Sequence, residues 1–172
     1  DVCSSDLGAG SPMAWPPVAL SPAVGPPTAK GHQVAVCLSG GYLKATIRPT
    51  EQGEQQQVRI QQYLQSWYRT SALERLQEKT TRYAQQIGVT PTGLSVRNFR
   101  SRWGSCDKRG QVIFNWASIK APHSIVDYVV IHELCHLINP NHSKDFWQLL
   151  GRHDASYPEH RQRLKERGEG LL

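Results

Sequence analysis

The sequence predicts an α+β fold in which one buried helix packs against a small antiparallel sheet, with a long helix before both. Two observations predict the sheet and the helices. Short β-rich runs occur in pairs around turn residues, as in β-hairpins. Longer segments repeat apolar residues at helical spacing, and the apolar run Val129–Ile131 indicates that one helix is buried.

The composition is that of a globular protein. The chain has 172 residues, 38% hydrophobic and 20% charged, which is enough for one domain with a hydrophobic core. Its four cysteines form no C-x-x-C pair, so neither a cysteine-only zinc knuckle nor a disulfide scaffold is expected. Neither a membrane-spanning run nor a signal peptide is recognisable, so a cytoplasmic location without membrane attachment is expected.

The N-terminal segment, residues 1–31, is predicted to be disordered. The stretch from Ser11 to Pro27 contains six prolines and little periodic apolar pattern, so neither a helix nor a paired strand is expected there. Residues 1–7 resemble the translated end of a common sequencing adapter, which makes part of this segment an expected assembly artefact. Residues 32–172 are predicted to form one domain.

The domain is predicted to begin with a hairpin and a long helix. Residues 33–48 contain two β-rich runs around a Ser-Gly-Gly turn. Residues 54–87 are predicted to be helical and to end at Gly88, and Pro91 prevents continuation. The apolar stripe of this helix recurs mostly at steps of three or four, or their sums, and consists of Ile60, Leu64, Trp67, Ser71, Leu76, Tyr83 and Ile87.

A second hairpin and three helices are expected in the rest of the chain. The hairpin pairs residues 94–99 with residues 111–116, since turn residues lie between these runs. The helices are predicted to extend over residues 124–138, from a cap at Ser143 to about Gly151, and from the Ser-x-x-Glu pattern at Ser156 to about Arg167.

The helix predicted over residues 124–138 carries the chemistry. It contains the pattern His132-Glu133-Leu134-Cys135-His136. Side chains four apart on a helix share one face, with Cβ atoms about 5–6 Å apart, so His132 and His136 can hold one zinc ion. Glu133 lies one step round the helix, where it can act as general base toward a zinc-activated water. A lone histidine here would be a core residue, but these three side chains are costly to bury without a metal.

His142 is the expected third ligand. Asn139 and Pro140 end the helix before it, so the chain can turn back toward the metal. The alternative is a histidine on a surface loop. The spacing of the three histidines matches the extended metzincin motif. However, Asn139 replaces the usual glycine of that motif, and the only methionine, Met13, lies upstream.

Four segments together resemble the YgjP-like metal-dependent hydrolases, which are relatives of the SprT-like and WLM-type zinc peptidases. The resemblance covers about Glu54 to Arg167. Its segments are Ser101–Cys106, Phe114–Trp116, Asp127–Leu137 and Asn141–Trp147. It implies zinc on His132, His136 and His142, Glu133 as the catalytic base, and a zincin-like fold with the second hairpin beside the active-site helix. Two departures are a shorter β-rich N-terminal part and His160 where the family often has tyrosine.

Four further residues are candidates for binding substrate: Arg102, Trp103, Gly104 and Asn115. Zinc peptidases often bind an extended peptide along a strand edge, which the segment from Arg102 to Cys106 could provide. The alternative is a strand end and turn with Trp103 in the core, and an Asn115 that only satisfies backbone groups. Cys135 is expected to be a buried thiol rather than a ligand.

Two supporting roles remain open. The residue that stabilises an oxyanion is Tyr157, His153 or His160, and the sequence does not choose among them. The candidate carboxylates for orienting a ligating histidine are Asp127, Asp145 and Asp154, and the alternative for each is a solvated surface charge.

The function predicted is zinc-dependent peptide hydrolysis on a protein or peptide substrate. The alternatives are a nucleic-acid-binding module with a structural or vestigial zinc site, a DNA-associated SprT-like protease, and a hydrolase of non-peptide amides. The first rests on the net charge of +6 and on a basic second hairpin that also contains Phe99 and Trp103. Its basic residues are Arg97, Arg100, Arg102, Lys108 and Arg109. The second rests on analogy with the SprT-like relatives, which act on proteins attached to DNA. The oligomeric state is left open.

Overall fold

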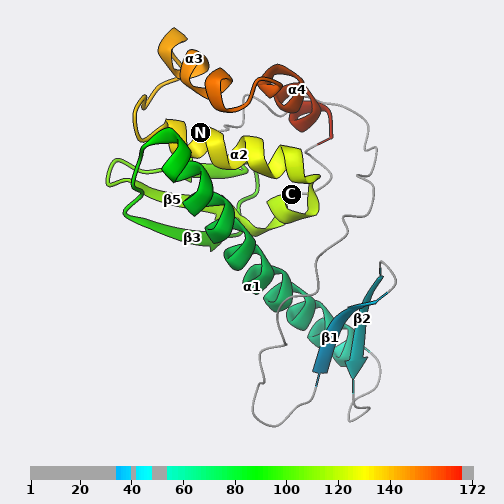
Figure 1. The fold of residues 1–172 in the computed structure, drawn as a ribbon. Coiled ribbons are helices and arrows are strands. Elements are labelled where there is room, and N and C mark those ends of the chain that lie inside the picture. The colour runs from blue at the N-terminus through cyan, green and yellow to red at the C-terminus, as the bar shows by residue number, and fades with distance from the viewer. Residues whose placement is uncertain (1–33, 40–41, 48–53, 168–172) are drawn as a thin grey trace.

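Helix α2 (His123–Cys135) is the element around which the others are arranged in the structure, a computed structural model that describes residues 34–39, 42–47 and 54–167. The small sheet and α1 (Glu54–Ile87) lie on one side of α2, and α3 (Lys144–His153) and α4 (Tyr157–Arg167) lie on the other (Figure 1). The predicted α+β class and the long first helix are confirmed.

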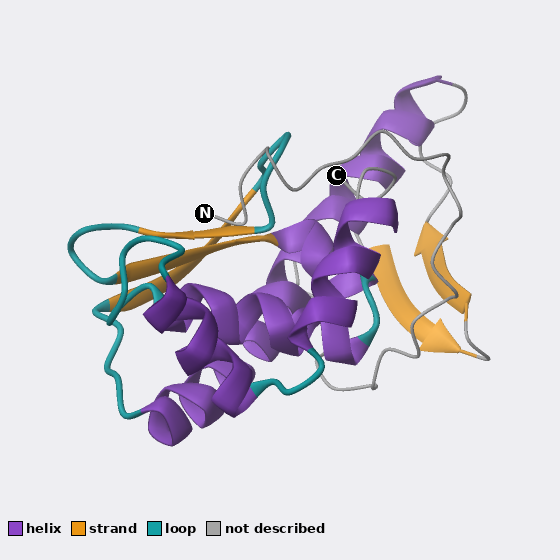
Figure 2. Ribbon diagram, turned by 90° about the horizontal axis from the view of Figure 1, so that it is seen from above, coloured by secondary structure: helices purple, strands orange, loops and turns teal. Residues whose placement is uncertain are grey.

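The first hairpin is confirmed. Strands β1 (Val34–Ser39) and β2 (Tyr42–Ile47) pair antiparallel, from Val34 opposite Ile47 to Ser39 opposite Tyr42. Figure 2 shows this hairpin as a group of strands separate from the other sheet. The segment 1–31, predicted to be disordered, lies outside the described residues.

Helix α1 has the predicted bounds, but of the predicted apolar stripe only Leu76 is fully buried, while Tyr83 and Ile87 are partly buried against the core. The side chains that are fully or nearly fully buried are Ala72, Leu76, Thr80 and Ala84, at steps of four residues. The prediction counted large apolar residues, whereas the small Ala72 and Ala84 allow α1 to approach the neighbouring elements closely. In the described part of the chain, neither this long helix nor any other is apolar enough over sufficient length to cross a membrane.

The second sheet corrects the predicted antiparallel hairpin. Strands β3 (Gly93–Arg97), β4 (Gly104–Cys106) and β5 (Gln111–Asn115) form a sheet in the order β3-β5-β4. β3 is parallel to β5, and β4 is antiparallel to β5. The sheet is therefore mixed, because the tight turn joins β5 to β4 rather than to β3.

Turn chemistry explains this topology. One Asp107 carboxylate oxygen accepts hydrogen bonds from the backbone N–H groups of Arg109 and Gln111, both at 2.9 Å. Gly110 has φ of +80°, a conformation that favours glycine, and closes the turn. β4 was not predicted from the sequence, because Gly-Ser-Cys is short and low in β-propensity.

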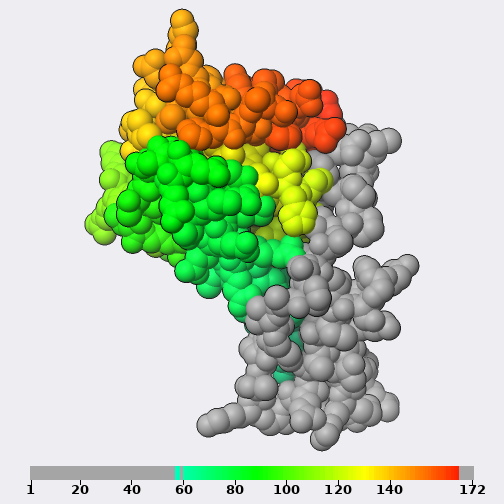
Figure 3. Space-filling view, in the orientation of Figure 1, coloured from blue at the N-terminus to red at the C-terminus, as the bar shows by residue number. Residues whose placement is uncertain are grey.

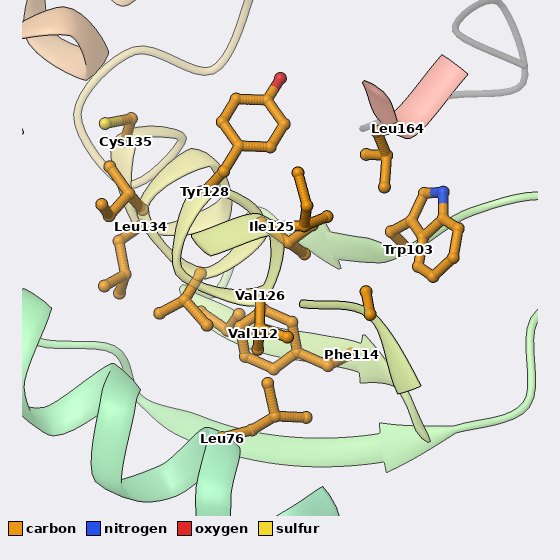
Figure 4. Packing of buried hydrophobic residues seen from close by; sticks show 14 of the residues in the cluster. Leu76, Trp103, Val112, Phe114, Ile125, Val126, Tyr128, Leu134, Cys135 and Leu164 are labelled. Atoms are coloured by element: carbon orange, nitrogen blue, oxygen red, sulfur yellow. The ribbon is translucent and has the colours of Figure 1, made fainter. Parts of the chain in front are cut away.

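Helix α2 is buried along almost its whole length. Ten of its thirteen residues are buried, from Ile125 to Cys135 with the exception of Asp127. Figure 4 shows Phe114 and Val126 above Leu76 of α1, with Trp103 near Leu164 of α4. The apolar sides of the sheet, α1, α2 and α4 thus meet in one core. A 3-10 helix, η2 (Trp116–Lys120), leads from β5 to α2 and was not predicted.

We expect Leu76→Ala to lower the free energy of unfolding by about 2–5 kcal/mol, because Leu76 is fully buried and the truncation leaves a cavity. Chemical denaturation followed by circular dichroism measures the change. Leu73→Ala is the matched control on the same helix, since Leu73 is 40% exposed and should change the free energy by less than about 0.5 kcal/mol. Equal losses in both variants would contradict the placement of Leu76 in the core.

Candidate metal centre

Three histidines converge at one end of α2. Their potential ligand atoms, on His132, His136 and His142, all lie within 4.8 Å of one another. The Nε2 atoms of His132 and His142 are 3.0 Å apart, and the ring centroids of His132 and His136 are 4.9 Å apart. The third histidine, predicted as the ligand after the helix, is therefore brought to the other two. His142 is also exposed on a loop, as the alternative held, so its role as a ligand stays a prediction.

The end of α2 explains how His142 returns to the site. The helix ends at Cys135, three residues earlier than predicted, and tightens as Leu137 and Ile138 donate to carbonyls three residues back. Nδ1 of His136 lies 3.1 Å from the carbonyl oxygen of Asn139. Because a carbonyl can only accept, Nδ1 carries the proton and Nε2 keeps its lone pair for a metal.

The buried histidines have the protonation state that metal binding needs. Burial lowers the pKa of His136 to about 4. Burial, followed by the neighbouring His136 and His142, lowers the pKa of His132 well below its usual value. Both rings are therefore neutral near pH 7, and neutral imidazole is the form that binds a metal. Because His142 is exposed, the cluster opens toward solvent. These properties fit a divalent metal with a free coordination position.

Glu133 is fully buried between α2 and β4. A Cβ added at Gly104 would lie 2.7 Å from Oε1 of Glu133, 2.8 Å from Cγ and 2.9 Å from Cδ. The backbone of β4 at Gly104 therefore leaves room for the carboxylate only because this residue has no side chain. The sequence named Gly104 as a candidate for substrate contact, and the structure places it against the proposed base.

We expect Gly104→Ala to reduce catalysis by about 100-fold, because the new methyl group must displace either Glu133 or β4 by a large fraction of an ångström. Steady-state kinetics on a peptide substrate measure the loss. The matched control is Gly93→Ala in β3, whose Cβ would meet only Gln111 atoms at 3.9 Å and 4.0 Å. The idea fails if Gly104→Ala keeps the activity of Gly93→Ala.

The other candidates for substrate binding lie around the same sheet end. Arg102 is exposed and its guanidinium is 5.5 Å from the Phe99 ring centroid, whereas Trp103 is 1% exposed in the core. The Asn115 side chain donates to the carbonyls of Phe99 and Arg102, at 2.9 Å and 3.2 Å. It also accepts from the Ala117 N–H at 3.1 Å. Asn115 therefore fastens the β3–β4 connection, and its direct contact with substrate stays a prediction.

The three carboxylates considered as partners of a ligating histidine lie elsewhere. Asp127 forms ion pairs with Lys79 and Arg82 of α1. Asp154 binds His160, with Oδ2 2.8 Å from Nδ1, and Asp145 is exposed in the first turn of α3. The Nδ1 atom of His136 instead uses a backbone carbonyl, as described above.

The candidates for oxyanion stabilisation divide by environment. The Tyr157 ring stacks on Trp147 with centroids 5.5 Å apart. The His160 side chain is held by Asp154 and lies with its centroid 6.3 Å from that of Tyr128. His153 is half-buried in the last turn of α3. The role itself stays a prediction for all three.

The basic residues of the predicted second hairpin lie at two ends of the sheet. All five are exposed. Arg97, Arg100 and Arg102 lie at the end of the sheet where Arg97 pairs with Asn115. Lys108 and Arg109 lie at the opposite end, where Thr92 donates to the carbonyls of Arg109 and Gly110. The two ends are separated by the length of the five-residue strand β3, whose four steps of about 3.3 Å amount to about 13 Å.

The two cysteines near the site are protonated thiols. Burial and the charge of Glu133 raise the pKa of Cys106 to about 11, and burial raises the pKa of Cys135 to about 12. Cys135 is fully buried among apolar side chains, as predicted. Neither thiol belongs to the group of potential ligand atoms that the three histidines form in the described residues.

Sequence reasoning missed the contribution of Phe146. This fully buried ring lies with its centroid 4.9 Å from that of His132, 4.6 Å from that of His136 and 4.8 Å from that of His142. The signal was present, because the Ser143 cap begins α3 directly after His142 and places Phe146 in its first turn.

Comparison with known proteins gives one family match and two similar structures. The profile of the YgjP-like, metallopeptidase domain family matches residues 29–167. The crystal structure of the metallopeptidase zymogen abylysin from Pyrococcus abyssi aligns with TM-score 0.45 and 18% identity over 50% of this chain and 87% of that chain. The zymogen jannalysin from Methanocaldococcus jannaschii aligns with TM-score 0.48 and 13% identity over 56% and 97%. No curated protein sequence matches.

Proposed function

Because this chain belongs to the YgjP-like metallopeptidase family, we propose that it is a zinc-dependent peptidase with Glu133 as general base. The family match confirms the resemblance recognised in the sequence motifs. The observation that carries the proposal is the convergence of three imidazoles within 4.8 Å, next in sequence to the buried Glu133. His132, His136 and His142 are the proposed ligands.

The donor set supports zinc as the metal. Zinc accepts imidazole nitrogen readily, and a catalytic zinc site typically has three protein ligands and one open position. Oxygen-rich sites suit magnesium and calcium instead, and the described cluster contains only histidines. Exposure of His142 leaves one side of the cluster accessible to a substrate.

The chain's own residues divide the chemistry between them. His132, His136 and His142 would hold the ion, and the Asn139 carbonyl orients the His136 ring. When bound, zinc polarises a carbonyl group and lowers the pKa of water toward neutrality. Glu133 takes a proton from the attacking water and passes it to the leaving amine. The hydroxide adds to the scissile carbonyl carbon and the C–N bond breaks, so one water is consumed for each peptide bond hydrolysed. Burial of Glu133 against Gly104 keeps the carboxylate in place during both transfers.

The position of β4 supports an extended peptide as substrate. Within the described sheet, β4 is an edge strand and Gly104 brings its backbone against Glu133. An extended peptide that pairs with such an edge places a scissile bond near the base. Arg102, Gly104 and Asn115 are the residues proposed to contact it, and Trp103 is buried in the core next to β4.

A direct test combines metal analysis with a cleavage screen. The full chain is purified, its metal is measured by mass spectrometry, and it is incubated with an unfolded protein whose fragments are sequenced. We expect about one zinc per chain, loss of cleavage after dialysis against a chelator, and recovery when zinc is restored. Cleavage that persists in the metal-free protein would exclude this mechanism. A folded, zinc-loaded protein that cleaves no peptide bond would exclude peptidase function.

A further inference from the structure

The third histidine of the metal centre is not fixed by the helix that holds the other two. His132 and His136 belong to the buried face of α2 and its end, whereas His142 is exposed in the connection to α3. A side chain on an exposed connection normally samples several rotamers. Some other contact must therefore hold the His142 ring where its Nε2 meets that of His132.

The first of these contacts comes from the start of α3. The Ser143 side chain accepts from the Phe146 N–H at 3.4 Å, which fixes the first turn directly after His142. The buried Phe146 ring meets the His142 ring edge-on at 83°. The Phe146 ring contacts all three histidine rings, so it supports the whole cluster and not His142 in particular.

The second contact is a parallel stack on His142 by a ring that meets His132 only edge-on, with the Trp147 and His132 centroids 6.1 Å apart at 66°. The indole of Trp147 stacks on the His142 ring, with centroids 5.5 Å apart and an interplanar angle of 22°. Trp147 also stacks on Tyr157, at 5.5 Å and 20°, and the Arg161 guanidinium lies 4.7 Å from the Trp147 ring centroid. The rings of His142, Trp147 and Tyr157 therefore form one continuous stack that links the α2–α3 connection, α3 and α4. Figure 3 shows α3 and α4 lying together over one side of α2.

The stack restrains the rotation that would remove His142 from the metal. Near-parallel rings at this separation attract one another, and a cation over an indole adds electrostatic attraction. Turning the His142 ring away would lose its contact with Trp147. Trp147 itself cannot follow the ring freely, because Tyr157 and Arg161 hold it from α4.

We infer that Trp147 is a positioning residue of the metal centre, which acts through His142 and is held in place by Tyr157 and Arg161. This inference rests on the proposed metal centre and extends it to the last helix. It assigns α4 a role in retaining the metal, although none of the three histidines lies on that helix.

The test measures metal affinity without substrate. Wild type, Trp147→Leu and Trp147→Phe are titrated with zinc against a chromophoric chelator, and the visible absorption of the Co²⁺ forms reports the coordination geometry. Trp67→Leu is the matched control, because Trp67 is a half-buried tryptophan on α1 with an aromatic neighbour, Tyr68, at 5.3 Å. Circular dichroism confirms that each metal-free variant is folded.

We expect Trp147→Leu to lower zinc affinity by about 10–100-fold and to change the Co²⁺ spectrum, as loss of a residue that orients a ligand does. Trp147→Phe keeps a ring for stacking and should stay within a few-fold of wild type, and Trp67→Leu should match wild type. Unchanged affinity and an unchanged Co²⁺ spectrum in folded Trp147→Leu would overturn the inference.

A second variant protects the test against misfolding. If Trp147→Leu does not fold, Tyr157→Leu removes the far side of the stack and leaves Trp147 in place. A several-fold loss of affinity supports the inference, and wild-type affinity overturns it. None of these measurements involves cleavage, so the two proposals can fail separately. If the variants lose metal affinity but the wild-type protein hydrolyses no peptide, the role of Trp147 is supported and the peptidase function is refuted.

Discussion

Glu133→Gln is expected to lower kcat for peptide cleavage by a factor of about 100 to 10,000, because a neutral amide cannot accept the proton of the attacking water. The amide has nearly the same shape as the buried carboxylate, so its fit against Gly104 is preserved. Glu133 is not part of the histidine cluster, so the zinc content should stay equal to that of wild type. Discontinuous assays, in which samples are quenched at set times and the fragments are sequenced, measure the loss of rate. Mass spectrometry measures the zinc content of each protein.

The matched control for this substitution is Glu159→Gln. Glu159 is exposed in the first turn of α4, so the same chemical change there should leave kcat and metal content unaltered. If Glu133→Gln cleaves as fast as Glu159→Gln, another group must act as the base. If Glu133→Gln instead loses its zinc, the loss of rate does not report on proton transfer, and the expectation that Glu133 has no part in holding the metal is wrong.

His142→Ala is expected to weaken zinc binding by more than about 100-fold, since the loss exceeds that caused by removing a group that merely orients a ligand. Cleavage at low micromolar zinc should disappear with the metal. The fold should persist, because His142 is exposed and is not one of the residues that form the hydrophobic core. Isothermal titration gives the affinity, and circular dichroism tests the fold.

His123→Ala is the control for His142→Ala. His123 is exposed at the first turn of α2 and lies outside the histidine cluster, so its removal should leave zinc affinity unchanged. Equal affinities for zinc in the two variants would show that the ion uses only His132 and His136 from this chain. The connection after α2 would then have no part in the centre.

The end of α1 and the start of α3 were predictable because a single residue determines each of them. Gly88 ends α1 with φ of +80°, and the Ser143 side chain caps α3. The sheet was not predictable in the same way. The strand that pairs with β5 across a tight turn is decided by the local Asp107 turn. The parallel pairing of β3 also depends on hydrogen bonds from Asn115 to the β3–β4 connection, between residues 13 and 16 positions apart in the sequence. Periodicity within a strand does not contain this information.

The site was predictable where a helix sets the spacing. His132 and His136 follow from the four-residue repeat, and His142 from the break at Asn139 and Pro140. What surrounds them was not predictable, because it depends on how α3 and β4 pack against α2. Phe146 beneath the histidines and the close approach of Gly104 to Glu133 are tertiary contacts between separate segments. The pairing of Asp154 with His160 likewise removes a carboxylate that sequence alone left available.

The unequal anchoring of the three histidines has a kinetic consequence. Amide hydrogens of α2 are expected to exchange with solvent only when the whole domain unfolds, because ten of its thirteen residues are buried. The exposed segment 140–142 can open by local fluctuation at far lower cost. A bound ion should therefore escape through this segment while the domain remains folded. Its release rate should follow the frequency of that local opening, and a chelator should empty the protein long before it denatures.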